Sequence, residues 1–250
     1  MQRANGILSA VCGVAFALGM GSAGARADGP SWTGFYVGAH AGHGWADWNA
    51  HVAHPCNCDT LGGKPAFAGS EAMGGDGWHG GIQAGANKQL GNFVLGVEID
   101  VSRASMDGEH TFRMDYDTDW AVQTRLDWFG TARVRLGHSF GNLLIYGTGG
   151  LAWGRVEADM QTISITGPVT MSELSSTTYH VGWAAGAGAE WMLGPNLSLQ
   201  AQYLYVDLGK ADYDPKGTAY AGQPHAFAHH ELMSADLKFH TIRAGLNLRF

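Results

Sequence analysis

Charged residues, proline and long apolar runs are all scarce in this chain of 250 residues. Charged side chains make up only 15% of the sequence, which is low for a water-soluble globular protein. Glycine is abundant, with 38 residues, but it shows no collagen-like period. Beyond residue 27, no stretch holds the roughly 18 consecutive apolar residues that a membrane helix needs. A helical membrane protein is therefore excluded. A membrane β-barrel is not, because barrel strands are apolar on one side only.

Positive charge is also in short supply. Lys and Arg together number 15 against 22 Asp and Glu, and the formal net charge is −7. Nothing resembles the basic stripe of a nucleic-acid-binding protein, so we expect no nucleic-acid partner. A glycine-rich phosphate loop is missing as well, because the glycines recur beside aromatic residues, where close-packed barrel walls need them.

The first 27 residues resemble a secretory signal peptide. Arg3 supplies the positive start, residues 7–24 are apolar or small, and residues 25–27 read Ala-Arg-Ala, which fits a cleavage site before Asp28. A short core helix is the alternative interpretation. We predict that residues 1–27 are removed, together with Cys12, and that residues 28–250 form one outer-membrane β-barrel domain.

The last fourteen residues, LKFHTIRAGLNLRF, alternate between apolar and polar side chains. Counted back from the C-terminus, the apolar or nearly apolar positions are Phe250, Leu248, Leu246, Ala244, Ile242 and His240. A period of two predicts a β-strand with one apolar and one polar face. Such a strand fits a soluble barrel or sandwich, and it equally fits a transmembrane barrel whose apolar face meets lipid.

The same alternation recurs in eight segments, and their connections decide between these folds. Short turns at residues 90–92, 139–142 and 194–196 alternate with long polar stretches at 46–77, 104–121, 157–177 and 210–235. This pattern is typical of outer-membrane barrels with both termini in the periplasm. A Greek-key sandwich would not alternate so regularly. The sequence thus predicts an all-β fold, an eight-stranded antiparallel up-and-down transmembrane β-barrel with short periplasmic turns and long extracellular loops.

Charges avoid the middle of the faces predicted to meet lipid, where a Lys or Arg costs about 2–4 kcal/mol. The few on these faces fall near strand ends: Lys88, Arg103, Arg155 and Asp207. Aromatic residues gather near the same ends and predict two interfacial girdles. They are Phe35, Phe93, Trp128, Trp153, Tyr179, Trp191, Tyr203, Tyr205 and Phe250.

The inward faces carry the remaining charges of the strands. These are Glu98, Asp100, Asp127, Arg133, Arg135, Glu190 and Arg243. Eight strands enclose an interior only just wide enough for its own side chains, and buried charges must pair. We predict a network of ion pairs that plugs the lumen.

Four segments together resemble the small outer-membrane β-barrel proteins (porin-family, surface-immunogen) of α-proteobacteria. The segments are WTGFYVGAHAGHGW after the signal, LLIYGTGGLAWG, YHVGWAAGAGAEW and the terminal RAGLNLRF. The resemblance covers most of the mature chain. It implies a barrel similar to the membrane domain of outer membrane protein A, and it implies that the strand ending in Phe250 is the signal read by the barrel-assembly machinery.

The first long polar stretch, HVAHPCNCD, offers the only cluster of soft metal ligands near one place in the sequence. His51, His54, Cys56 and Cys58 bring two imidazoles and two thiols within eight residues. A Cys56–Cys58 disulfide or a plain polar loop are the alternatives. More histidines lie in later polar stretches: His110, His225, His229 and His230. Converging loops could ligate a metal or an iron porphyrin, and some proteins of the similar family are described as haemin-binding, but solvated histidines are the alternative. We therefore expect no resident cofactor, with metal or haemin as the alternative.

An enzyme is the least favoured function. His180 and Glu190 share a face but are ten residues apart on one strand, about 33 Å at ~3.3 Å per residue. His138 and Ser139 fall in a predicted periplasmic turn, and no Ser, His and acid meet on one outward face.

We predict a monomeric structural barrel with a role in envelope integrity and surface properties, in contact with outer-membrane lipid and lipopolysaccharide, with limited passage of small solutes left open. The alternatives are a surface protein that binds metal or haemin, and a narrow porin.

Overall fold

The computed structural model describes residues 30–53, 68–114, 118–164, 170–213, 216–219, 227–230 and 232–250. Side chains are described for residues 30–46, 74–107, 125–157, 177–210 and 237–250. The predicted signal peptide, residues 1–27, lies outside these ranges and stays a prediction. Among the described residues, there is no helix with the length and apolar character needed to span a membrane.

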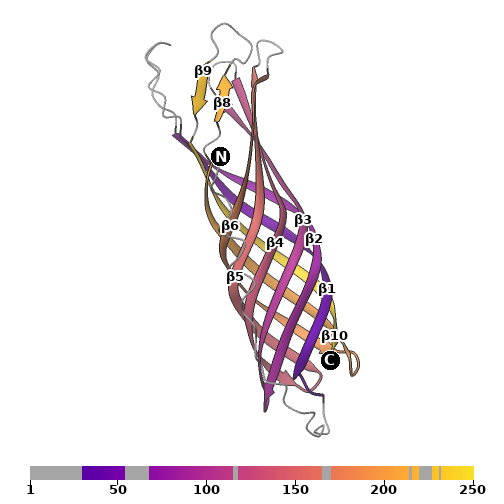
Figure 1. The fold of residues 1–250 in the computed structure, drawn as a ribbon. Coiled ribbons are helices and arrows are strands. Elements are labelled where there is room, and N and C mark those ends of the chain that lie inside the picture. Colours follow the sequence, from indigo (N-terminus) through magenta and orange to yellow (C-terminus); the bar gives the residue numbers. More distant parts are fainter. Residues whose placement is uncertain are drawn as a thin grey trace, which may run out of the picture.

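Eight long strands form one closed barrel, in which each strand pairs antiparallel with the next and the last closes onto the first (Figure 1). They are β1 (Gly34–Ala53), β2 (Ala68–Leu90), β3 (Phe93–Met114), β4 (Thr118–Phe140), β5 (Leu143–Ser164), β6 (Thr170–Met192), β7 (Leu197–Tyr213) and β10 (Leu232–Arg249). Two short strands between β7 and β10, β8 (Lys216–Ala219) and β9 (Phe227–His230), pair with each other. The predicted eight-stranded up-and-down barrel is confirmed.

The three short turns all lie at one end of the barrel, which we call the turn end; the opposite end is the far end. The strands tilt strongly (Figure 1). A path of Cα partners that starts at Leu90 runs once around the barrel and returns to the same strand at Gly80, ten residues further along. A stagger of this kind is what closes a barrel around strands tilted by about 35–45°.

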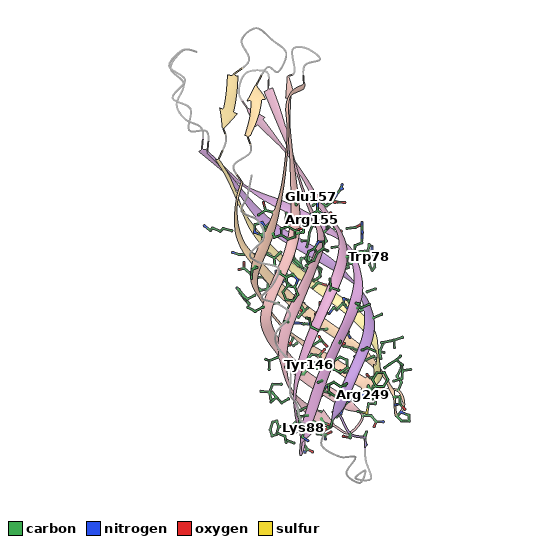
Figure 2. The ribbon with its side chains drawn as sticks, viewed as in Figure 1. Trp78, Lys88, Tyr146, Arg155, Glu157 and Arg249 are labelled. Atoms are coloured by element: carbon green, nitrogen blue, oxygen red, sulfur yellow. The ribbon has the colours of Figure 1, made fainter. Side chains whose placement is uncertain are left out.

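The outward faces are apolar, as the alternation predicts. Ile82, Val134 and Leu151 are 65%, 53% and 61% exposed, although they lie in the middle of long strands. At the turn end the outward faces carry Phe35, Phe93, Phe140, Trp191 and Phe250. Nearer the far end they carry Trp45, Trp78, Trp128, Trp153, Trp183 and Tyr205, which we call the upper aromatic ring. Figure 2 shows Lys88 and Trp78 at these two levels of the wall.

The strands are much longer than the sequence predicts. They contain 17 to 23 residues, whereas a tilted membrane span needs about 9–11. The polar stretches at 46–77, 104–121, 157–177 and 210–235, expected to be loops, are in large part strand. The prediction relied on apolar residues at every second position, which only the part of a strand that faces lipid requires. Beyond the membrane this requirement ends, but the strands stay paired through their main-chain hydrogen bonds.

The apolar and charged faces exchange sides beyond the upper aromatic ring. There the outward positions hold Asp76, Asp107, Arg125, Glu157 and Lys210, while the inward positions hold Met106, Leu126, Val156, Leu208 and Leu237, each no more than 2% exposed. Below the ring the arrangement is the reverse, with apolar residues outside and polar ones inside. The part of the barrel beyond the ring is therefore built like a water-soluble protein around an apolar core.

Toward the far end the wall divides into two four-stranded sheets. β6 and β7 are paired only from Trp183–Asp207 toward the turn end, and β2 and β3 only from Asp76–Asp107 toward the turn end. Beyond these points, in the described strands, β3, β4, β5 and β6 stay paired as one sheet, and β7, β10, β1 and β2 as another. Figure 1 shows the strands diverging at this end.

Candidate functional site

Six of the seven charged residues predicted for the lumen meet in one buried network. Glu98 and Asp100 come from β3, Arg133 and Arg135 from β4, Glu190 from β6 and Arg243 from β10, and each is at most 3% exposed. Arg133 Nη2 lies 2.6 Å from Glu98 Oε1 and 2.7 Å from Asp100 Oδ2. Arg133 stands directly opposite Glu98 in the ladder between β3 and β4, so strand register alone brings this pair together.

Arg135 and Arg243 extend the network across the lumen. Arg135 Nη2 donates to Glu190 Oε2 at 2.7 Å, and Arg135 Nη1 lies 3.3 Å from Glu98 Oε2. Arg243 Nη1 donates to Asp100 Oδ1 at 3.1 Å. Because the partners come from strands on different sides of the barrel, these ion pairs bridge the interior. Removing one partner of a buried pair costs about 3–5 kcal/mol, because a buried charge is left uncompensated.

Two tyrosines complete the surroundings of Arg135. Tyr36 Oη donates to Glu98 Oε2 at 2.6 Å and accepts from Arg135 Nη1 at 2.5 Å. The Arg135 guanidinium lies over the Tyr146 ring, 3.9 Å from its centroid. Gln200 Nε2 donates to Tyr146 Oη at 2.5 Å. The guanidinium is thus held by charge, hydrogen bond and aromatic face together.

Asp127 is a correction to the prediction. Its carboxylate does not join the network; Oδ2 lies 3.6 Å from Arg155 Nη1, and both side chains are partly exposed. The ladder between β4 and β5 shifts register between Leu126 and Trp128, so Asp127 is the extra residue of a β-bulge. Strict alternation, counted from the inward Arg133 and Arg135, assigns Asp127 to the inward face. The bulge inserts one extra residue at this point and so changes the count.

The turn end is closed by a residue that the sequence reasoning placed only at the start of the first strand. Trp32 is fully buried, and its indole nitrogen donates to Gly141 O at 3.1 Å. Its backbone nitrogen donates to Gln89 Oε1 at 2.8 Å, and its carbonyl accepts from Arg249 Nη2 at 2.9 Å. The ring belongs to a buried apolar group with Val94, Leu144, Tyr146 and Met192. Trp32 therefore fills the mouth of the barrel.

Above the charge network the lumen is lined first by histidine and hydroxyl side chains, then by apolar ones. His40 and Ser102 are hydrogen-bonded through Nε2 and Oγ at 2.7 Å, and His79 and Thr241 through Nε2 and Oγ1 at 2.5 Å. The next layer is the edge-to-face pair of Phe129 and Phe239, with centroids 5.0 Å apart. Beyond it lies the apolar core described above. The lumen is filled by side chains at each of these levels.

The sequence reasoning missed four residues of this interior: Trp32, Tyr36, Tyr146 and Arg249. Tyr36, Tyr146 and Arg249 each sit at inward positions of predicted strands, so alternation could have found them. Arg249 Nη1 lies 3.4 Å from Glu190 Oε1 and adds a fourth arginine. Trp32 precedes the first strand, and no periodicity points to it.

The predicted metal ligands are not described as a site. His51 lies on β1 opposite Ser234 of β10, but its side chain is outside the described ones, and His54, Cys56 and Cys58 lie outside the described residues. The other histidines of the polar stretches, His110, His225, His229 and His230, have no described side chains either. Within the described part of the chain, no group of three or more His, Cys, Asp or Glu side chains is placed to hold a metal ion.

The residues considered for catalysis stay apart. His180 is a buried, inward residue of β6, whereas Glu190, on the same strand, is bonded to Arg135, Ser198 and Asn247 in the network. His138 packs between Phe93 and Phe140 at the turn end, with centroids 5.4 and 4.5 Å away. Ser139 Oγ donates to Gly141 O at 3.3 Å. Among the described residues, Glu190 therefore takes part in ion pairing, and His138 packs against aromatic rings.

Known proteins resemble this chain in sequence and in fold. The model of the outer membrane protein beta-barrel domain matches residues 14–250. The 31 kDa outer-membrane immunogenic protein of Brucella melitensis is 33% identical over 222 residues, covering 88% of this chain and 84% of that protein. The 22 kDa outer membrane protein of Rhizobium leguminosarum is 28% identical over 184 residues, covering 74% and 68%. The structure of the outer membrane protease OmpT from Escherichia coli matches 89% of this chain and 99% of that chain, with TM-score 0.50 and 9% identity; it shows the fold alone.

An apolar outer wall between two aromatic levels, a closed eight-stranded ladder and the match over nearly the whole chain agree with one another. They place the protein in the outer membrane of a Gram-negative bacterium, with the short turns toward the periplasm and the far end outside the cell. The chain belongs to the outer membrane protein beta-barrel domain family.

Proposed function

We propose that the protein is a closed structural barrel that contributes to the integrity and surface properties of the envelope and does not conduct solutes. The observation that carries this proposal is the filling of the lumen at successive levels, from Trp32 through the charge network to the apolar core beyond Phe129 and Phe239. A conducting barrel of this size would need a continuous path, and each of these levels would have to open.

The charge network is the strongest support. Glu98, Arg133 and Arg135 are held by several short contacts each, and separating them would leave buried charges without partners. The interior of an eight-stranded barrel has room only for its own side chains. A rigid, closed wall of this kind suits a protein that occupies and stabilises the membrane.

Conductance across a planar lipid bilayer tests the proposal. The refolded mature chain should give no discrete conductance steps, under conditions in which a general porin does. A variant with only the two aromatic levels emptied, Trp32→Ala combined with Phe129→Ala and Phe239→Ala, should stay closed as well, because the charge network still fills the lumen between them. Reproducible unitary steps from the unaltered chain would overturn the proposal and favour the narrow porin.

We propose no catalytic role. Among the described side chains, His180 faces the lumen and His138 lies at the periplasmic end, so neither meets a serine and an acid on the lipid-facing wall. A screen of the refolded protein for ester and peptide hydrolysis tests this, and turnover abolished by a single His substitution would contradict it.

Binding of metal or haemin is the alternative function that the sequence raises, and it stays a prediction. His51 lies toward the extracellular end of β1, as such a surface site requires. Isothermal titration with zinc, copper and haemin tests it. A variant with His51, His54, Cys56 and Cys58 all replaced by Ser is the control, and the alternative fails if the unaltered chain shows no heat at micromolar ligand.

A further inference from the structure

A compact group of aromatic side chains lies on the outer wall across β1, β10, β7 and β6. We call it the His240 cluster, and its members are Trp45, Trp183, Tyr203, Tyr205 and His240. His240 stacks on Trp45 with 5.7 Å between centroids and 9° between planes. The Tyr205 ring is 5.0 Å from that of His240, and Trp183 is 5.3 Å from Tyr205. The rings therefore form one connected surface on the membrane side of the protein.

The cluster lies where the acyl chains of the outer leaflet give way to headgroups. It includes three members of the upper aromatic ring, and Ile242, two residues further toward the periplasm than His240, is 57% exposed in the apolar band. Polar atoms are nevertheless built into it, because Tyr203 Oη and His240 Nδ1 are 2.6 Å apart. Rings with one apolar and one polar part favour this level of a membrane.

Two lysines stand just outside the cluster. Lys238 precedes His240 by two residues on the same outward face of β10, and Lys210 follows on the neighbouring β7. Neither forms an ion pair with a described carboxylate, and the side chain of Asp236, the Cα partner of Lys210, lies outside the described ones. Asp207, the Cα partner of Lys238, is engaged elsewhere, because its Oδ1 accepts from the Gly209 amide at 2.9 Å. Gly209 has a φ of 79°, which glycine adopts without strain.

Two outward cations on the opposite wall, in contrast, are paired within the protein. There Arg125 Nε lies 2.8 Å from Asp107 Oδ1, and Arg155 forms an ion pair with Glu157. Figure 2 shows Arg155 and Glu157 beside each other. These two cations of β4 and β5 are thus neutralised by the protein. Arg103 on β3, like Lys238 and Lys210, has no carboxylate partner among the described side chains.

We propose that the His240 cluster, with Lys238 and Lys210, binds the phosphorylated sugar headgroup of an outer-leaflet glycolipid of the lipid A type. The ammonium groups take the phosphate, through charge-assisted hydrogen bonds. The exposed faces of Trp45 and Trp183 pack against the apolar faces of the sugar rings. Below the cluster, Ala41, Ala244 and Ala201 are Cα partners on neighbouring strands, so acyl chains under the headgroup meet only methyl groups there.

Binding is measured on the refolded mature chain in detergent by native mass spectrometry, with three probes. Lipid A carrying its phosphates should remain bound, dephosphorylated lipid A should bind much less, and inorganic phosphate alone should not bind. Equal binding of the two lipids would overturn the proposal, since the lysines would then have no role. A dimer in place of a lipid adduct would also overturn it, because the face would then be an interface between copies.

Variants assign the binding to the residues. Lys238→Gln and Lys210→Gln should each weaken binding of phosphorylated lipid A about five-fold, the effect of about one surface cation near an anionic membrane. Trp45→Leu keeps the surface apolar and should weaken binding of both lipids. Lys88→Gln, at the periplasmic level of the same wall, is the matched control and should bind as the unaltered chain does. Mobility of the unboiled protein on a gel verifies folding of each variant, and unchanged binding by the folded double lysine variant would sink the proposal.

Discussion

Arg249, the penultimate residue of the chain, holds Trp32 from the opposite end of the sequence. Its Nη2 donates to the Trp32 carbonyl at 2.9 Å, and its guanidinium lies 4.7 Å from the centroid of one of the Trp32 rings. The first and last strands are neighbours in the barrel, so this contact also spans the seam where the sheet closes. The same contact therefore stabilises both the seam between β1 and β10 and the position of Trp32 in the periplasmic mouth.

Trp32→Ala should lower the free energy of unfolding by about 3–5 kcal/mol, the usual effect of removing a buried tryptophan. The change empties a site surrounded by Val94, Leu144 and Met192 and leaves Arg249 without its ring. The measurement is urea unfolding in lipid vesicles, followed by tryptophan fluorescence. Trp191→Ala, at the same end but 58% exposed on the lipid side, is the control, since lipid fills the space that it leaves. Equal losses in the two variants would show that Trp32 is no plug.

Arg135→Met should be among the most destabilising single changes, by about 3–5 kcal/mol, because Glu98 and Glu190 lose a buried partner. Combining it with Glu190→Gln should restore part of the loss, since one of the uncompensated charges disappears as well. A double-mutant cycle in urea measures this coupling. Arg125→Met, which breaks an exposed pair with Asp107, is the control and should change stability little. Strict additivity of Arg135→Met and Glu190→Gln would contradict the network.

A positive charge on the outer wall should be tolerated at one level and not at another. Val134→Arg places the charge in the middle of the apolar band and should cost about 2–4 kcal/mol. Val181→Arg makes the same change beyond Trp183, where the cost falls to about 0–1 kcal/mol. Both valines are exposed, at 53% and 73%, so burial does not distinguish them. Unfolding in bilayers measures the difference, and similar costs at both positions would mean that the membrane lies elsewhere on the barrel.

Deletion of Phe250 should impair assembly in cells while leaving the folded barrel nearly unchanged. The side chain is 75% exposed, and the residue contributes one main-chain bond, from its nitrogen to Phe35 O at 2.9 Å. If the terminal Phe is read by the assembly machinery, the deletion lowers the amount of heat-modifiable protein in the outer membrane. Refolding from urea into vesicles should proceed as for the full chain. Normal levels in the membrane would remove the assembly role from Phe250.

Alternation predicted the membrane-spanning part of the barrel because a lipid solvent imposes a strict requirement on every second residue. Leu95, Val134 and Leu246 could be assigned to the outward face from sequence alone for this reason, and the short turns followed. Beyond the upper aromatic ring the requirement relaxes, and strand continued where the sequence indicated only polar loop. The length of the strands is set there by ladder pairing, which leaves no pattern in the sequence.

The interior shows the same division between what a period can reveal and what it cannot. Glu98 and Arg133 were predictable as partners, because inward charges in a narrow lumen must pair. Asp127 was assigned to the wrong side because a bulge depends on the neighbouring strands, and one inserted residue changes the count. Trp32 lies before the first strand, so its place in the mouth comes from tertiary packing alone.

The reversal of sides at the tryptophans has a mechanical consequence. If the protein moved inward by two residues along its strands, about 6.6 Å, Arg155 and Glu157 would enter the acyl region with Asp107. If it moved outward by the same amount, Lys88 would be drawn toward the acyl region, and the exposed rings of Trp78 and Trp183 would enter the water outside the cell. Both displacements are opposed, so the vertical position of this barrel in the bilayer is fixed by its own sequence, and whatever projects from the cell surface is held at a constant height.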